Sequence, residues 1–171
     1  LTEIVTEAKK RNLYVGLITN GVLLADFAKV LHAWGVDSVS ISLNAAAAKS
    51  HKTCNGSDTW DRVLAGIIEA NRLMPGRVAV SMVCHRDNVA EMPVFLDLAT
   101  KLDVPTVDFL TLLPSEDGQD SSPIGDKPQI EINALRTHHE AHRVRTWPMV
   151  IKPNDCPRAC RSPYESISLD S

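Results

Sequence analysis

The chain has 171 residues, of which 44% are hydrophobic and 23% charged, and its formal net charge at pH 7 is −3. These values are typical of a globular protein with a full core and exclude an intrinsically disordered chain. The slightly acidic balance provides no basic surface, so we expect neither nucleic acid nor an anionic membrane as a partner. No apolar run is long enough to cross a bilayer, and the first residues show no signal peptide, which favours a cytoplasmic protein.

Strand and helix patterns alternate along the chain. Residues 13–44 show the unit most clearly, with apolar runs rich in β-branched residues on either side of an amphipathic helical pattern. Such a unit is typical of a right-handed β-helix-β connection within a buried parallel sheet. The predicted strands cover residues 13–19, 36–43, 77–83 and 106–113, and the predicted helices cover about residues 1–11, 22–34, 57–73, 88–102 and 129–145.

Local signals predict how several of these elements begin and pack. Ser57 is a candidate N-cap, and Asn88 and Glu91 form a pair of the capping-box type. The segment over residues 44–56 is longer than a simple connection needs and is predicted to be a loop with a functional role. The residues expected on the buried side of the second helix are Leu23, Leu24, Phe27, Val30, Leu31 and Trp34.

Four predicted parallel strands joined by helices indicate an α/β fold, either a doubly wound sheet or a (β/α) barrel, complete or partial. In both architectures ligands bind at the carboxyl ends of the strands. The long polar connections after residues 43 and 113 follow such ends. The polar residues to weigh as site residues are therefore Thr19, Asn20, Ser42, Asn44, His85, Arg86, Asn88 and Ser115.

Two of these positions have competing interpretations. A tight turn between strand and helix alone explains Asn20-Gly21, because both residues tolerate positive φ. Ser40, Ser42 and Asn44 alternate along one face of a strand, where polar side chains inside a barrel are costly unless they bind water or a ligand. For this face a binding role and a structural role are equally supported.

The cysteines provide one candidate metal site. Cys156 and Cys160 lie outside the repeating units, in a segment with prolines. Paired cysteines there are either ligands of zinc or of an iron-sulfur cluster, or two ordinary thiols. Cys54 and Cys84 have no partner at ligand spacing and are expected to be buried or loop thiols.

The order of the motifs resembles one known enzyme family. A strand ending in TNG precedes a helix ending in WG and a strand reading VSISLNA, and SHK, NVAEMPVFLDLA and VDFLTLLP follow in turn. Over residues 12–114 this succession resembles the radical S-adenosylmethionine (SAM) enzymes. The resemblance implies a partial (β/α)6 barrel of the TIM-like kind, in which a [4Fe-4S] cluster reduces SAM and the resulting 5′-deoxyadenosyl radical removes a hydrogen atom from the substrate.

The resemblance also implies roles for individual residues. Ser42 would bond the methionine or ribose part of SAM, and Asn44 would lie near the ribose. Leu113 would pack on the adenine. Thr19 matches a position that faces cofactor or substrate in the barrel mouth, and Asn20 beside it belongs to the same expected group of cofactor-binding residues.

The last part of the chain resembles another element of that family. From Cys160 onward, CRSPYESISLDS resembles the opening of a SPASM or twitch extension, where a cysteine helps to bind an auxiliary iron-sulfur cluster. We therefore expect a barrel portion over residues 1–145 and the start of an extension over residues 146–171, with Cys160 and Cys156 as candidate ligands.

The chain departs from the family by lacking its two cofactor loops. It contains neither the CxxxCxxC loop that holds the catalytic cluster nor the glycine-rich GGE-type segment. We therefore expect the catalytic cluster to be ligated outside this chain, which begins without Met and is expected to be a fragment, inactive alone, of a longer oxidoreductase or maturase. The expected substrate is a peptide or a small precursor molecule.

Two other functions stay open. A (β/α)-barrel lyase or aldolase without a cluster would need a catalytic lysine or paired carboxylates at strand ends, whereas Asp108 lies inside its predicted strand. The second alternative is a degenerate barrel that serves as a binding or scaffold module.

Overall fold

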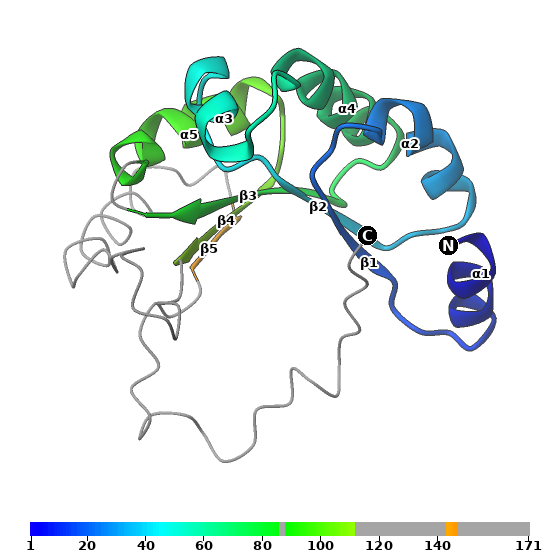
Figure 1. Ribbon diagram of the computed structural model, residues 1–171. Coiled ribbons are helices and arrows are strands. Elements are labelled where there is room, and N and C mark those ends of the chain that lie inside the picture. The colour runs from blue at the N-terminus through cyan, green and yellow to red at the C-terminus, as the bar shows by residue number, and fades with distance from the viewer. Residues whose placement is uncertain (86–87, 112–142, 147–171) are drawn as a thin grey trace, which may run out of the picture.

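Figure 1 presents the computed structural model of the chain, which describes residues 1–85, 88–111 and 143–146. The described strands form one sheet, and they are β1 (Gly16–Thr19), β2 (Ser38–Ser42), β3 (Val78–Cys84), β4 (Thr106–Thr111) and β5 (Arg143–Thr146). The described helices are α1 (Thr2–Lys10), α2 (Leu24–Ala33), α3 (Ala48–Asn55), α4 (Trp60–Leu73) and α5 (Met92–Lys101), with a 3-10 turn, η1 (Val89–Glu91), directly before α5.

The order of the strands decides between the two predicted architectures. Neighbouring strands follow the chain order from β1 to β5, and every pairing is parallel. Helices α2, α3, α4 and α5 lie together on one side of a curved sheet (Figure 1). A doubly wound sheet instead reverses its strand order and carries helices on both faces. The described residues therefore confirm a parallel α/β fold, and their arrangement is consistent with part of a (β/α) barrel.

The sheet has one apolar face and one polar face. Along β2, Val39 and Ile41 are fully buried, whereas Ser40 and Ser42 between and after them are half-buried. Side chains in a strand alternate between faces, so these two sets lie on opposite sides of the sheet. The apolar face packs against the helices, and its core includes Val78, Val80, Met82, Val107, Phe109, Ala28, Leu31, Val63, Ile67, Ala70, Phe95 and Leu96. We call the opposite side, which carries Ser40, Ser42, Ser81 and Asp108, the inner face.

Close contact between α2 and α4 depends on a glycine. A Cβ atom placed on Gly66 of α4 would lie 2.9 Å from the Leu24 Cβ and 3.1 Å from the Gly21 carbonyl oxygen. Gly21 itself has a φ of +81°, so the predicted Asn20-Gly21 turn is present. This turn brings the chain from β1 back over the sheet and places α2 directly against α4.

The second helix buries fewer residues than its sequence predicts. Leu24, Ala28 and Leu31 form the buried stripe of α2. Leu23, Phe27 and Val30 lie one position earlier and are exposed by 53%, 47% and 37%, so the prediction that they are buried is wrong. The helix has two adjacent apolar stripes, and only one of them can face α4 and the sheet.

Other local predictions also need correction. Residues 48–55 form α3 in the segment predicted to be a loop. The N-cap of α4 is Thr59 instead of Ser57, and no side-chain hydrogen bond caps this helix.

Asn88 and Glu91 do not form a capping box, because their side chains bind other elements, as described below. The described part contains five strands instead of four, and residues 143–145 belong to β5 although they were predicted to end a helix.

Several predictions concern residues outside the described ranges. They are the cofactor role of Leu113, the loop residue Ser115, the loop residue Arg86, the paired Cys156 and Cys160, and almost all of the predicted extension over residues 146–171. Within the described ranges, no helix has the length and apolar character that crossing a membrane requires.

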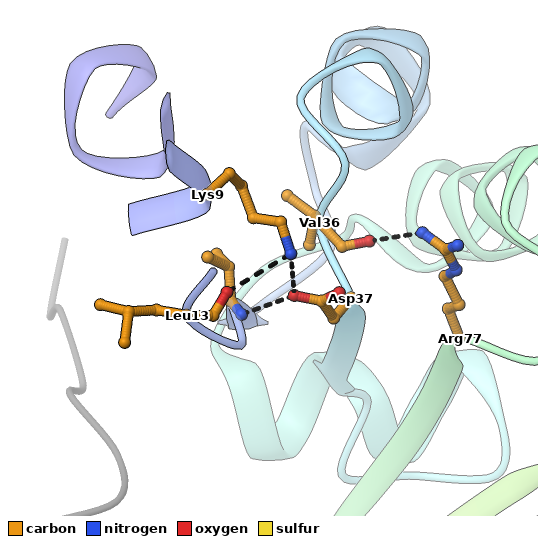
Figure 2. A network of polar contacts seen from close by, with 6 residues as sticks. Lys9, Leu13, Val36, Asp37 and Arg77 are labelled. Atoms are coloured by element: carbon orange, nitrogen blue, oxygen red, sulfur yellow. Dashed lines mark hydrogen bonds and ion pairs between the residues drawn. The ribbon is translucent and has the colours of Figure 1, made fainter. Parts of the chain in front are cut away.

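Polar contacts tie the amino ends of the first strands to α1 (Figure 2). Asp37, just before β2, accepts hydrogen bonds of 2.7 Å from Lys9 Nζ and of 2.7 Å from the Val15 N–H. Arg77, just before β3, donates to the Val36 carbonyl at 3.0 Å. Burial raises the pKa of the Asp37 carboxyl, but the hydrogen bonds from Lys9 and Val15 and the charges of Lys9 and Arg77 outweigh it and hold the pKa below its ordinary value.

This network predicts a pH-dependent loss of stability in Asp37→Asn. At pH 7 the substitution should lower the free energy of unfolding by about 1–2 kcal/mol, because a charged acceptor of two hydrogen bonds is lost. A carboxyl whose folded pKa is lowered stabilises the fold above its unfolded pKa, and this contribution disappears as the pH falls through the folded pKa. Urea unfolding at neutral pH and near pH 3 should therefore show the difference between wild type and variant shrinking in acid. Asp26→Asn, which removes an exposed partner of Arg62, is the control and should change stability by less than about 0.5 kcal/mol.

Candidate functional site

The carboxyl ends of β1, β2 and β3 form the candidate site. After β1, Thr19 Oγ1 accepts a hydrogen bond of 3.2 Å from the Gly21 N–H, and Asn20 Oδ1 accepts one of 3.1 Å from the Val22 N–H. Both oxygens therefore support the turn into α2, as the interpretation of this motif as a tight turn predicts. Thr19 is half-buried and Asn20 is exposed at the edge of the sheet.

Polar residues lie side by side on the inner face near this edge. Ser42, the last residue of β2, is in register with Ser81 of β3, and Ser81 is in register with Asp108 of β4. Ser81 and Asp108 are buried, at 4% and 5% exposure, while Ser42 is half-buried. Ser81 Oγ donates to the Ile41 carbonyl at 3.3 Å. The structure therefore brings a row of two hydroxyls and a carboxylate to the face predicted to receive a ligand.

Asn44 uses its side chain to join two strand ends. Its backbone has a φ of +61°, which an asparagine tolerates better than most residues. Its Oδ1 accepts the Val83 N–H at 3.0 Å, and its Nδ2 donates to Asn55 Oδ1 at 3.4 Å. Asn44 is thus at the predicted edge, two residues after Ser42, and its amide fixes the shape of that edge.

Asn88 completes this connection from the other side. Its side chain is 2% exposed, and its Oδ1 accepts the His85 N–H at 2.8 Å. Its Nδ2 donates to the Asn44 carbonyl at 3.2 Å and to the Val83 carbonyl at 2.9 Å. We call the contacts of the Asn44 and Asn88 amides the asparagine clasp. The clasp satisfies backbone groups that a parallel sheet leaves without partners where its strands end.

Helix α3 lies over this edge and is held by a buried histidine. His51 is 2% exposed, and its Nδ1 lies 3.2 Å from the Leu43 carbonyl oxygen. Its Nε2 lies 3.2 Å from Thr59 Oγ1, and its ring meets Trp60 edge to face at 5.4 Å. Asn55 Nδ2 also donates to the Leu43 carbonyl, at 3.3 Å. The middle and the last residue of α3 are therefore tied to Leu43, the residue that follows Ser42.

The start of α3 and its exposed side have further partners. Glu91 Oε2 accepts the Ala46 N–H at 2.8 Å and the Ser50 hydroxyl at 2.9 Å. Cys54 Sγ lies 3.8 Å from His85 Nε2, at the end of β3. Helix α3 thus contacts the residues that follow β2 and β3 and the turn before α5.

The described residues do not fit an iron-sulfur cluster. Among them, no group of three or more His, Cys, Asp and Glu side chains lies close enough to hold a metal ion. Burial raises the pKa of the Cys84 thiol to about 12, so the thiolate that a metal needs is not available there. Cys84 is buried, one of the two environments expected for these thiols, whereas Cys54 is exposed on α3 and lies neither in the core nor in a loop. The hydroxyls and amides at the strand ends suit the hydrogen-bonding groups of a polar organic cofactor.

Comparison with known proteins places the chain in a family. The profile of the Radical SAM superfamily matches residues 1–99, which is more than half of the 171 residues. The chain belongs to the radical SAM superfamily. The match includes β1, β2, β3, Ser42, Asn44 and the asparagine clasp, so it covers the candidate site. Membership of this superfamily implies SAM and a [4Fe-4S] cluster as cofactors.

Similar proteins carry a common description. A protein described as "Probable GTP 3′,8-cyclase" from Saccharolobus islandicus is 34% identical over 100 residues, which cover 58% of this chain and 32% of the relative. Proteins with the same description from Saccharolobus solfataricus and Metallosphaera sedula are 35% and 30% identical over 100 and 115 residues. The chain therefore spans about a third of the length of the curated relatives it matches.

The radical SAM resemblance seen in the motifs is thus confirmed at the level of the superfamily. The SPASM or twitch extension, the auxiliary cluster and the individual cofactor roles of Thr19, Asn20, Ser42 and Asn44 stay predictions. Sequence analysis missed the clasp role of Asn88 and the contacts of His51 and Glu91. Asn88 was recognisable as a polar residue after a strand, but its partners lie up to 44 residues away, where no local pattern indicates them.

The clasp predicts a large loss of stability in Asn88→Asp. The variant keeps the side-chain shape and the acceptor for the His85 N–H, but it loses both donated hydrogen bonds and sets a carboxylate oxygen against two carbonyls. The free energy of unfolding should fall by about 2–4 kcal/mol in urea titrations. Asn20→Asp is the control, because the oxygen that accepts the Val22 N–H is retained, and a similar loss in both variants would contradict the role of the clasp.

Proposed function

We propose that this chain is the part of a radical SAM enzyme that binds SAM at the carboxyl ends of β1, β2 and β3. The observation that carries the proposal is the superfamily match over residues 1–99, which covers Ser42 at the end of β2 and Ser81 in register with it on β3. Ligands bind at this end of the strands in (β/α) barrels. A cluster-free lyase would need a catalytic lysine or paired carboxylates, whereas β1 to β4 contain no lysine and one carboxylate, Asp108. The scaffold module has no comparable observation in its favour.

Each residue of the site has a proposed task. Ser42 donates or accepts a hydrogen bond with the methionine or ribose part of SAM. Asn44 lies near the ribose and keeps the end of β2 in position. Thr19 and Asn20 form the neighbouring wall of the barrel mouth, and Leu113 packs on the adenine. A [4Fe-4S] cluster, whose ligands we place outside this chain, would supply the electron that reductive cleavage of SAM needs. The barrel residues orient the cofactor and exclude water.

The proposed substrate is a small molecule from which hydrogen is abstracted. The relatives described as GTP 3′,8-cyclases make a purine nucleotide the first compound to test. The strands β1 to β4 contain no Lys, Arg or His and one carboxylate, Asp108, so phosphate groups would need partners elsewhere. Arg143 and Arg145 of β5 occupy the register positions beside Thr106 and Asp108. A peptide substrate is the alternative, and assays with GTP and with candidate peptides distinguish the two.

The role of Ser42 predicts a specific loss of SAM affinity in Ser42→Ala. In the complete gene product, reconstituted without oxygen, the dissociation constant of SAM measured by calorimetry should rise about tenfold, because one hydrogen bond to the cofactor is lost. Ser40→Ala is the matched control, since Ser40 lies on the same face of the same strand but farther from its carboxyl end. Absence of SAM binding in the wild-type protein would contradict the proposed function. Equal affinity in wild type and Ser42→Ala would remove Ser42 from the site.

We further propose that residues 146–171 begin an extension that binds an auxiliary iron-sulfur cluster through Cys160, with Cys156 as a second candidate ligand. Cys160→Ala should lower the iron content of the reconstituted full-length protein by about four atoms, the share of one [4Fe-4S] cluster. Cys54→Ala, which removes an exposed thiol of α3, is the control and should keep the wild-type iron content. Unchanged iron in the Cys160 variant would eliminate the auxiliary cluster at this position.

A further inference from the structure

We infer that Glu91 is a positioning residue for SAM, because its carboxylate fixes the segment that enters α3 and, through α3, the end of β2 that carries Ser42. The inference rests on the proposed function, since it takes SAM to bind beside Ser42. Glu91 itself lies at the end of η1, directly before α5, and has no place among the cofactor-contacting residues predicted from the sequence.

Two hydrogen bonds connect Glu91 to the start of α3. Its Oε2 accepts the Ala46 N–H at 2.8 Å and the Ser50 hydroxyl at 2.9 Å. These partners precede Glu91 by 45 and 41 residues. Hydrogen bonds to an ionised acceptor are about twice as strong as bonds between neutral groups, so this carboxylate is a strong attachment point for the segment.

Helix α3 needs such a partner from outside. Its N-cap is Ala47, no side chain caps it, and its first turn contains no acidic residue. With eight residues it is too short to be stable alone in water. A carboxylate near a helix N-terminus interacts favourably with the helix dipole. Glu91 supplies, from the turn before α5, the negative charge that the local sequence of α3 lacks.

The middle and the last residue of α3 transmit this constraint to the candidate site. His51 Nδ1 lies 3.2 Å and Asn55 Nδ2 lies 3.3 Å from the Leu43 carbonyl oxygen. Asn55 also accepts a hydrogen bond from Asn44 at 3.4 Å. Leu43 and Asn44 are the two residues that follow Ser42. If α3 loosens, the Leu43 carbonyl and the Asn44 amide lose these partners, and the two residues that follow Ser42 are held less firmly, while the bonds between β2 and β3 remain.

The asparagine clasp makes this effect separable from unfolding. Asn88 binds the Asn44 and Val83 carbonyls independently of Glu91, so the ends of β2 and β3 stay joined when Glu91 is changed. Loss of the Glu91 carboxylate should therefore loosen α3 and weaken SAM binding more than it lowers the melting temperature.

The test compares Glu91→Gln with wild type in the complete gene product, using SAM itself as the probe. The substitution keeps the side-chain size and removes the charge. We expect the dissociation constant of SAM to rise roughly fivefold at 25 °C, and trypsin to cleave faster after Lys49 and Lys52, which lie in α3. Glu69→Gln is the matched control, because Glu69 is also half-buried but pairs with Arg72 on α4, and neither quantity should change. Ser50→Ala removes one of the two contacts and should give a smaller shift, which keeps the test valid if Glu91→Gln does not fold.

The outcomes separate this inference from the proposed function. If wild type binds SAM and the Glu91 and Ser50 variants bind it equally well, the positioning role is wrong and the proposed function stands. A weaker affinity without faster cleavage in α3 also overturns the inference, because the effect would not pass through the helix. If wild type does not bind SAM, the proposed function fails and the inference fails with it.

Discussion

The asparagine clasp is the interaction on which the geometry of the candidate site depends. Where parallel strands end, the last N–H and C=O groups lose their neighbours, and a buried group without a partner is costly. The amides of Asn44 and Asn88 supply both donors and acceptors, and together they satisfy the Val83 N–H, the Val83 and Asn44 carbonyls and the His85 N–H. Only a side chain with both functions can do this. Ser42 therefore sits at the end of a strand that cannot shift freely against β3.

The two edges of the sheet have different tasks. At the amino ends, Asp37 connects α1, β1 and β2 through charged hydrogen bonds, which contribute stability (Figure 2). At the carboxyl ends, the clasp and α3 bind the residues that follow Ser42, and Ser42 is in register with Ser81, which is in register with Asp108. This division is general in (β/α) barrels, where one end carries stability and the other carries chemistry. The superfamily match extends over both edges, so it includes the support of the site as well as the site.

Local patterns in the sequence predicted much of the fold, namely the first four strands, most helices and the position of Ser42 at a strand end. They could do so because alternation and helical spacing depend only on neighbouring residues. The missed features depend on distant partners. Helix α3 begins in a run of alanines without a cap, and the carboxylate that supports it belongs to Glu91 in another element. The exposure of Phe27 on α2 is set by which of two apolar stripes meets α4, which composition alone does not decide.

Hydrogen exchange of the complete gene product, measured by mass spectrometry with and without SAM, tests most directly whether the clasped strand ends hold the cofactor. The account predicts that SAM slows amide exchange over residues 41–47 and 83–91, where the clasp, α3 and Glu91 meet. It predicts no change around Asp37 and Lys9 at the opposite edge. Protection at the amino-end network alone, or SAM binding that leaves residues 41–47 unchanged, would contradict it.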